Sequence, residues 1–204
     1  MEEFPALVAR ANTLARQAGF TPGRQQAGDA GDGDPPSCLP CVGRLLAVLA
    51  AGCHEGRIGE IGTGVGLGSA WMASSMPADC MLVTVEIDEE KAAHATRLLA
   101  GDGRVMVLNG DPKDLMPTCA PYDLLYADGG TRDRASFASL VDLLRVGGQL
   151  VTDDVTPPAA LPADSPLPAC GIKRDFFFGD PRLVSTEIVL PDQRNSLLIG
   201  TRLA

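Results

Sequence analysis

Residues 60–69 read EIGTGVGLGS, a glycine-rich turn between an expected strand at 57–61 and an expected helix at 68–76. Glycine tolerates the backbone conformations of a sharp turn and lets a ligand approach the main chain closely. A dinucleotide-binding fingerprint would need its third glycine at position 67, where this chain has leucine. The stretch therefore predicts a ligand loop of a different spacing, GxGxG, with the acid Glu60 just before it.

Beyond Gly52 the sequence alternates short aliphatic runs with helical stretches, which is typical of a parallel sheet with crossover helices. The expected strands are 57–61, 81–86, 105–109, 122–128 and 149–153, and the expected helices are 68–76, 88–100 and 133–145, with a short turn near Asp114. Two further strand-like runs, 183–190 and 197–203, are separated by a loop short enough for antiparallel neighbours. We therefore predict an α/β fold: a Rossmann-like, doubly wound, mostly parallel sheet closed by a C-terminal antiparallel hairpin.

The length of 204 residues predicts a single domain over 1–204. Apolar spacing predicts an N-terminal helix at 4–18, and the Gly, Asp and Pro residues that follow predict a flexible segment up to residue 37. The core is expected over 38–204. Because the flexible segment offers little to cover the apolar face of the N-terminal helix, we expect a homodimer that uses this face.

Charge and hydropathy narrow the classes of partner. Lys and Arg number 17 against 26 Asp and Glu, a net charge of −9, which is the wrong sign for a nucleic acid partner. No apolar run approaches the roughly 18 to 20 residues that span a bilayer, and residues 1–20 do not read as a signal peptide. We therefore expect a cytoplasmic protein without a membrane partner. The six cysteines, including the pair Cys38-Leu-Pro-Cys41, are expected to be reduced thiols.

Acidic or polar residues stand at or just beyond the end of every expected parallel strand. Ligands of open α/β sheets bind outside the carboxyl ends of the strands, so these side chains should converge on one rim. In chain order they are Glu60, Glu86, Asn109 with Asp111, Asp128, and Asp153 with Asp154. Glu86 stands 20 residues after Gly66, where an acid accepts hydrogen bonds from ribose hydroxyls. The combination of this acid with the glycine turn predicts an adenosine-containing ligand.

The motifs together carry a family resemblance. The runs EIGTGVGLGS, VTVEID at 83–88 and NGD at 109–111 resemble the class I S-adenosylmethionine-dependent methyltransferases. The later runs YDLLYADGG at 122–130, LLRVGGQLVTDD at 143–154 and LPDQRNSLLIGTR at 190–202 are similar to the O-methyltransferases related to catechol and caffeoyl-coenzyme-A O-methyltransferases. The resemblance covers roughly residues 38–204.

The resemblance implies a binding site for S-adenosyl-L-methionine. The glycines would lie under its methionyl part, Glu86 would bind both ribose hydroxyls, and Asp111 would lie near the adenine. Two positions depart from the family: the serine that usually holds the cofactor carboxylate falls at Gly68, one place before Ser69, and Pro112 has no N–H to offer the adenine. The expected cofactor-binding residues are Glu60, Gly62, Gly64, Gly66, Ser69, Glu86, Asp111 and Asp128.

Three carboxylates should share one small space beside the cofactor, namely Asp128, Asp153 and Asp154. Unpaired, they would repel one another, whereas a hard divalent cation such as Mg²⁺ or Ca²⁺ would resolve the conflict. In the resembling family these positions hold the metal, usually with asparagine where this chain has Asp154. The alternative is that some of these acids cap loops or pair with arginines, the candidates being Arg132, Arg134 and Arg174.

The implied activity is transfer of a methyl group to a hydroxyl of a small molecule, catechol-like and assisted by the metal, with Asp128 as the catalytic residue. A metal lowers the pKa of a coordinated phenol and fixes its oxygen. The family's lysine, three residues after the first metal aspartate, is Thr131 here, and no nearby lysine obviously replaces it. Two alternatives remain: a non-catalytic S-adenosylmethionine-binding protein and an NAD-dependent oxidoreductase.

Overall fold

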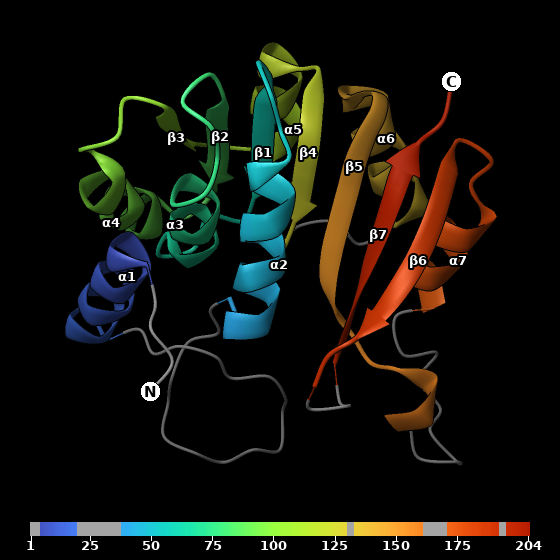
Figure 1. Cartoon of the computed structure of the whole chain (residues 1–204), viewed down its shortest axis with the longest axis horizontal. Coiled ribbons are helices and arrows are strands. Elements are labelled where there is room, and N and C mark those ends of the chain that lie inside the picture. Colours follow the sequence, from blue (N-terminus) through green and yellow to red (C-terminus); the bar gives the residue numbers. More distant parts are fainter. Residues whose placement is uncertain (1–4, 20–37, 130–132, 161–170, 192–194) are drawn as a thin grey trace.

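A computed structural model describes residues 5–19, 38–129, 133–160, 171–191 and 195–204. Its centre is a sheet of seven strands in the order β3-β2-β1-β4-β5-β7-β6 (Figure 1). The strands are β1 (Arg57–Ile61), β2 (Met81–Glu86), β3 (Val105–Asn109), β4 (Tyr122–Ala127), β5 (Leu144–Val155), β6 (Leu183–Val189) and β7 (Ser196–Arg202). Strands β1 to β5 are parallel, and β7 is antiparallel to both β5 and β6. The predicted fold class and closing hairpin are confirmed.

Helices cover both faces of the sheet, and each face has its own apolar core. In Figure 1, α2 crosses the near face while α6 and α7 lie behind the sheet. The helices are α1 (Ala6–Gln17), α2 (Pro40–Ala51), α3 (Leu67–Ala73), α4 (Glu89–Leu99), α5 (Pro112–Leu115), α6 (Arg134–Leu143) and α7 (Gly171–Gly179), with short 3-10 turns at Met116–Cys119 and Pro158–Ala160. Among the described residues, no helix combines the length and apolar character needed to cross a bilayer.

The N-terminal helix α1 is part of the near-face core. Its apolar side chains Val8, Ala11 and Ala15 are buried, and the helix contacts α3 and α4. The expectation that this apolar face lacks a cover is therefore wrong, because helices of the same chain cover it. The homodimer stays a prediction without that support. The expected flexible segment falls, apart from Gly19, outside the described residues.

Strand β5 begins earlier than predicted and is longer. The helix expected at 133–145 ends at Leu143, and Leu144 already pairs with Tyr122 of β4. The register then shifts before Leu124 pairs with Gln149, and Gly147 in this interval has a φ of +80°. An irregular strand entrance with two glycines lacks the alternating apolar pattern that marks a strand, which explains the error.

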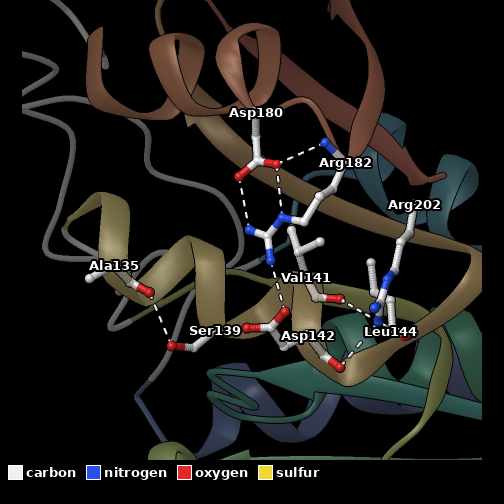
Figure 2. Close-up of polar contacts among 8 residues, drawn as sticks. All are labelled: Ala135, Ser139, Val141, Asp142, Leu144, Asp180, Arg182 and Arg202. Atoms are coloured by element: carbon white, nitrogen blue, oxygen red, sulfur yellow. Dashed lines mark hydrogen bonds and ion pairs between the residues drawn. The ribbon is translucent and has the colours of Figure 1, made fainter. Parts of the chain in front are cut away.

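A polar cluster joins α6 to the C-terminal hairpin (Figure 2). Arg182 donates to Asp180 and, at 2.8 Å, to Asp142 near the end of α6. Arg202 of β7 donates to the last carbonyls of α6 and to the Leu144 carbonyl. A cation at these carbonyls complements the negative end of the helix. The cluster thereby fixes α6, whose other surface lines the cavity described next.

Candidate active site

The glycine loop, residues 62–66, connects β1 to α3 through backbone conformations that favour glycine. Gly62, Gly64 and Gly66 have φ values of +90°, +52° and +90°, a region that side chains with a Cβ rarely adopt. A Cβ on Gly62 would lie 3.3 Å from the Gly129 nitrogen, whereas a Cβ on Gly64 would meet no atom within 4 Å. The sequence prediction of a sharp turn is confirmed, and the space beside Gly64 is open to a ligand.

Glu86, at the end of β2, is the polar anchor of this loop. It is buried, and its Oε2 accepts a hydrogen bond of 2.7 Å from the Gly64 nitrogen, while Oε1 accepts one of 3.0 Å from the Asp88 nitrogen. Each carboxylate oxygen has two lone pairs, so both retain capacity for a further donor. Asn109 donates from Nδ2 to the Glu86 carbonyl and ties the end of β3 to β2.

A cavity of about 870 Å³ opens beside this anchor. Of the expected cofactor-binding residues, Gly62, Glu86 and Asp111 line it. Asp111 also caps α5, since its Oδ1 accepts from the Lys113 nitrogen at 2.8 Å. The structure adds a wall that the sequence analysis did not name, formed on α6 by Ala135, Ser136, Ser139, Leu140 and Leu143. The signal in the sequence was a helical spacing of three small side chains and two leucines along one face.

Glu60 and Ser69 lie behind the glycine loop rather than on the cavity wall. Both are buried, and the Ser69 hydroxyl donates to Glu60 Oε2, which also accepts from Thr84 at 2.6 Å. A Cβ on Gly68 would lie 2.2 Å from Glu60 Oε1. The absence of the family's serine at this position therefore makes room for the Glu60 carboxyl, and Ser69 uses its hydroxyl to hold that carboxyl.

Burial gives Glu60 a pH-dependent effect on stability. Removal from water, partly offset by the Ser69 and Thr84 hydrogen bonds, raises its pKa to about 7. An acid whose pKa is higher in the folded state contributes stability below its unfolded pKa and loses it as pH rises through the folded value. Glutamine stays neutral at every pH. We therefore expect the unfolding free energy of Glu60→Gln minus that of wild type to rise by about 3 kcal/mol as the pH is raised from 4.5 to 8.

Denaturant unfolding of both proteins across this pH range measures the difference, with the exposed Glu89→Gln as the control. A gap between Glu60→Gln and wild type that does not change with pH would show that Glu60 titrates normally.

The carboxylate cluster, Asp128, Asp153 and Asp154, forms where β4 and β5 end. One carboxylate oxygen from each residue lies within 4.8 Å of the others. Asp128 follows β4 and keeps its nitrogen bonded to the Ile61 carbonyl at 3.0 Å. The register of β5 against β7 shifts between Thr152 and Val155, and Asp154 has a φ of +54°. This interruption of the strand turns the two consecutive aspartates of β5 toward one space, although alternation along a regular strand would send them to opposite faces.

Burial and mutual repulsion raise the pKa values of two carboxyl groups in the cluster. Burial, followed by the charge of Asp154, raises the pKa of Asp153 to about 6, although its Oδ2 accepts a 2.8 Å hydrogen bond from the Tyr126 hydroxyl. Asp128 keeps solvent-exposed surface, yet protein packed around its carboxylate and the charges of Asp153 and Asp154 raise its pKa as well. Within the described part of the chain, Asp153 Oδ1 is buried and accepts no hydrogen bond. The donor set is all oxygen, which suits a hard divalent cation.

Three residues near the cluster were not assigned to it from the sequence. The buried Cys38 thiol, just before α2, has its pKa raised by burial and then by Asp153 and Asp128. Tyr126 supports Asp153. Lys173 of α7 donates to the Asp153 carbonyl, so a lysine that the sequence analysis did not name lies beside the cluster, although this contact does not make it the counterpart of the family's lysine. Thr131, where the family has its lysine, lies outside the described residues.

The structure describes two of the three arginines that were candidates for pairing with the cluster. Arg174 donates to Glu187 at 2.7 Å and to the Thr156 carbonyl at 2.8 Å, and Arg134 donates to the Asp175 carbonyl. None of these contacts involves Asp128, Asp153 or Asp154. Arg132 lies outside the described residues.

Comparisons with known proteins agree with this geometry. A family described as a methyltransferase domain matches residues 60–155. A curated relative from Mycobacterium sp. (strain KMS), named "Putative O-methyltransferase", is 32% identical over 154 residues, which cover 72% of this chain and 69% of the relative.

Solved structures share the fold. The O-methyltransferase TomG of Streptomyces achromogenes, involved in tomaymycin synthesis and solved with S-adenosylmethionine, has a TM-score of 0.70 at 24% identity, covering 99% of this chain and 92% of that one. An O-methyltransferase from Bacillus cereus, solved with S-adenosylhomocysteine, has a TM-score of 0.73 at 20% identity, covering 99% and 93%. The solved structures show the shared fold, and the curated relatives show that the chain belongs to the O-methyltransferases of the class I S-adenosylmethionine-dependent methyltransferases.

Proposed function

We propose that this chain methylates a hydroxyl of a small, catechol-like molecule and that a divalent cation at the carboxylate cluster assists the reaction. The observation that carries the proposal is the adjacency of two sites. Gly129, which lines the cavity, directly follows Asp128 of the cluster. A ligand whose ribose lies at Glu86 can therefore extend along the glycine loop toward the three carboxylates.

The residues present fit a hard cation. Asp128, Asp153 and Asp154 would hold it, and the buried Asp153 Oδ1 supplies an oxygen that accepts no hydrogen bond from the described residues. When bound, a divalent cation lowers the pKa of a hydroxyl that it coordinates and neutralises the repulsion among the carboxylates. Two adjacent hydroxyls on an aromatic ring match such a site because both can bind one cation.

The chain's own residues supply binding and orientation. The loop glycines let the main chain approach the methionyl part of S-adenosylmethionine, and Glu86 fixes the ribose through its remaining lone pairs. Tyr126 and Lys173 hold Asp153 by its side chain and by its main chain, respectively. Methyl transfer is an in-line displacement that needs alignment of donor and acceptor more than covalent help, so such fixed geometry provides most of the acceleration.

A comparison of two acceptors tests this function. With S-adenosylmethionine and Mg²⁺, we expect catechol to yield a monomethyl ether detectable by mass spectrometry, and phenol to react at least about 100-fold more slowly, because it offers the cation a single oxygen. Heat-denatured protein is the control. Equal rates for phenol and catechol would argue against chelation of the acceptor, and turnover of neither acceptor would remove the catechol-like assignment.

A further inference from the structure

Lys173 occupies a distinctive place at the carboxylate cluster. Its Nζ donates a hydrogen bond of 2.5 Å to the main-chain carbonyl of Asp153, and its charge acts on the Asp153 carboxylate. The side chain is partly buried and comes from α7, which follows β5 in the chain after residues 156–170, of which 161–170 lie outside the described residues. The ammonium therefore contacts the backbone that carries two of the three acids, rather than an acid oxygen.

This backbone is the part of β5 that regular sheet pairing does not fix. The pairs with β4 end at Val151, and the pairs with β7 run to Thr152 and resume only at Val155. Asp153 and Asp154 lie in this interval, and Asp154 has the left-handed φ of +54°, which costs a non-glycine residue on the order of 1 kcal/mol. Such a conformation persists only where surrounding contacts hold it.

Helix α7 provides those contacts from one side. Lys173 binds the Asp153 carbonyl, and its neighbour Arg174 binds the Thr156 carbonyl at 2.8 Å and the Glu187 carboxylate of β6 at 2.7 Å. Two consecutive cationic side chains thus hold main-chain carbonyls on either side of Asp154. Arg174 is in turn fixed to the hairpin by its ion pair with Glu187.

We propose that Lys173 is a positioning residue for the cation: its bond to the Asp153 carbonyl holds the interrupted end of β5 so that Asp153 and Asp154 face Asp128. This inference rests on the proposed function, because it requires that the carboxylate cluster binds a divalent cation. It goes further in assigning to α7, outside the motifs of the glycine loop and strand ends, control over the geometry of the metal site.

Charge and positioning predict opposite signs for the loss of this lysine. An ammonium repels a cation bound nearby, so if charge were its only effect, Lys173→Met would strengthen metal binding. If the lysine positions the ligands, Lys173→Met should weaken metal binding by about 10- to 100-fold, the usual effect of losing a partner that orients metal ligands. Lys173→Arg, which keeps a cationic donor, should restore most of the affinity.

Titration of Mn²⁺ into the full chain, followed by electron paramagnetic resonance without S-adenosylmethionine or acceptor, measures this affinity directly. Lys91→Met removes the same charge from α4 and is the control, expected to bind Mn²⁺ as wild type does. S-adenosylhomocysteine affinity, recorded for each variant, should stay near wild type because Lys173 does not line the cavity, and the melting temperature of each variant checks that it is folded.

The outcomes distinguish a failure of the metal-assisted function from a failure of the positioning role alone. If wild type binds no Mn²⁺, the metal-assisted function fails and the role of Lys173 fails with it. If wild type binds Mn²⁺ and Lys173→Met binds it equally or more tightly, only the positioning role is overturned. Should Lys173→Met not fold, Lys173→Gln decides, since it also lacks the charge: weaker binding than in Lys173→Arg supports positioning, and tighter binding refutes it.

Discussion

Replacing Glu86 by alanine is expected to weaken S-adenosylhomocysteine binding by at least about 100-fold, because hydrogen bonds to a charged group are worth about 1.5 to 3 kcal/mol each and two ribose hydroxyls would lose theirs. The same change removes the acceptor of the Gly64 nitrogen, which leaves the glycine loop without its polar anchor. Isothermal titration calorimetry measures the affinity, and the product is the preferred ligand because it does not react.

The control must separate binding from folding. Glu89→Ala removes one exposed acid three residues further on and should leave the affinity unchanged. Glu86→Gln keeps the shape and one acceptor, so its affinity should lie between those of wild type and Glu86→Ala. If Glu86→Ala remains folded by circular dichroism and binds S-adenosylhomocysteine as tightly as wild type, the ribose is not held at Glu86 and the assignment of the cavity is wrong.

The parts of the site that local sequence dictates could be predicted. Glu86 and Asp128 stand at strand ends, and parallel strands bring their carboxyl ends to one edge whatever the rest of the chain does. The glycine loop was equally readable, because positive φ at Gly62, Gly64 and Gly66 is a demand that few other residues meet. These predictions needed only the order of the elements.

The position of Glu60 could not be predicted from its residue type and its place before the glycines alone. It was expected with the cofactor because it precedes the glycines, but side chains alternate along a strand, and Glu60 shares the face of Ile58, which packs in the core beneath α2 and α3. That parity was available in the sequence. It would have placed Glu60 behind the loop, where the structure finds it bonded to Ser69 and Thr84.

The contribution of α7 could not be read in this way. Lys173 stands 20 residues after Asp153, and its approach to the Asp153 carbonyl depends on how the hairpin and α7 pack at the end of the sheet. The interruption of β5 is likewise a tertiary feature, since two consecutive aspartates in a regular strand would point to opposite faces. Long-range packing, which no local pattern encodes, completes the carboxylate cluster.

Replacing Asp153 by alanine is expected to give the largest loss of activity. Asp153 is the buried member of the cluster, and the variant would lose both its carboxylate oxygens, including the one that accepts no hydrogen bond from the described residues. If metal assistance supplies several kcal/mol at the transition state, kcat/KM for a catechol should fall by at least about 1,000-fold. Mass-spectrometric initial rates, with and without excess chelator, measure the effect.

A measurement of S-adenosylhomocysteine affinity shows whether this loss of activity is separate from cofactor binding. Asp153 does not line the cavity, so S-adenosylhomocysteine should bind Asp153→Ala within about threefold of wild type, a difference below 1 kcal/mol. Asp175→Asn, an exposed acid on α7, controls for the change in charge and should keep full activity. Chelator should reduce wild-type turnover to the level of Asp153→Ala and leave that variant unaffected, because both treatments remove the same cation. Wild-type turnover that persists in excess chelator, with Asp153→Ala still inactive, would instead give Asp153 a role that needs no metal.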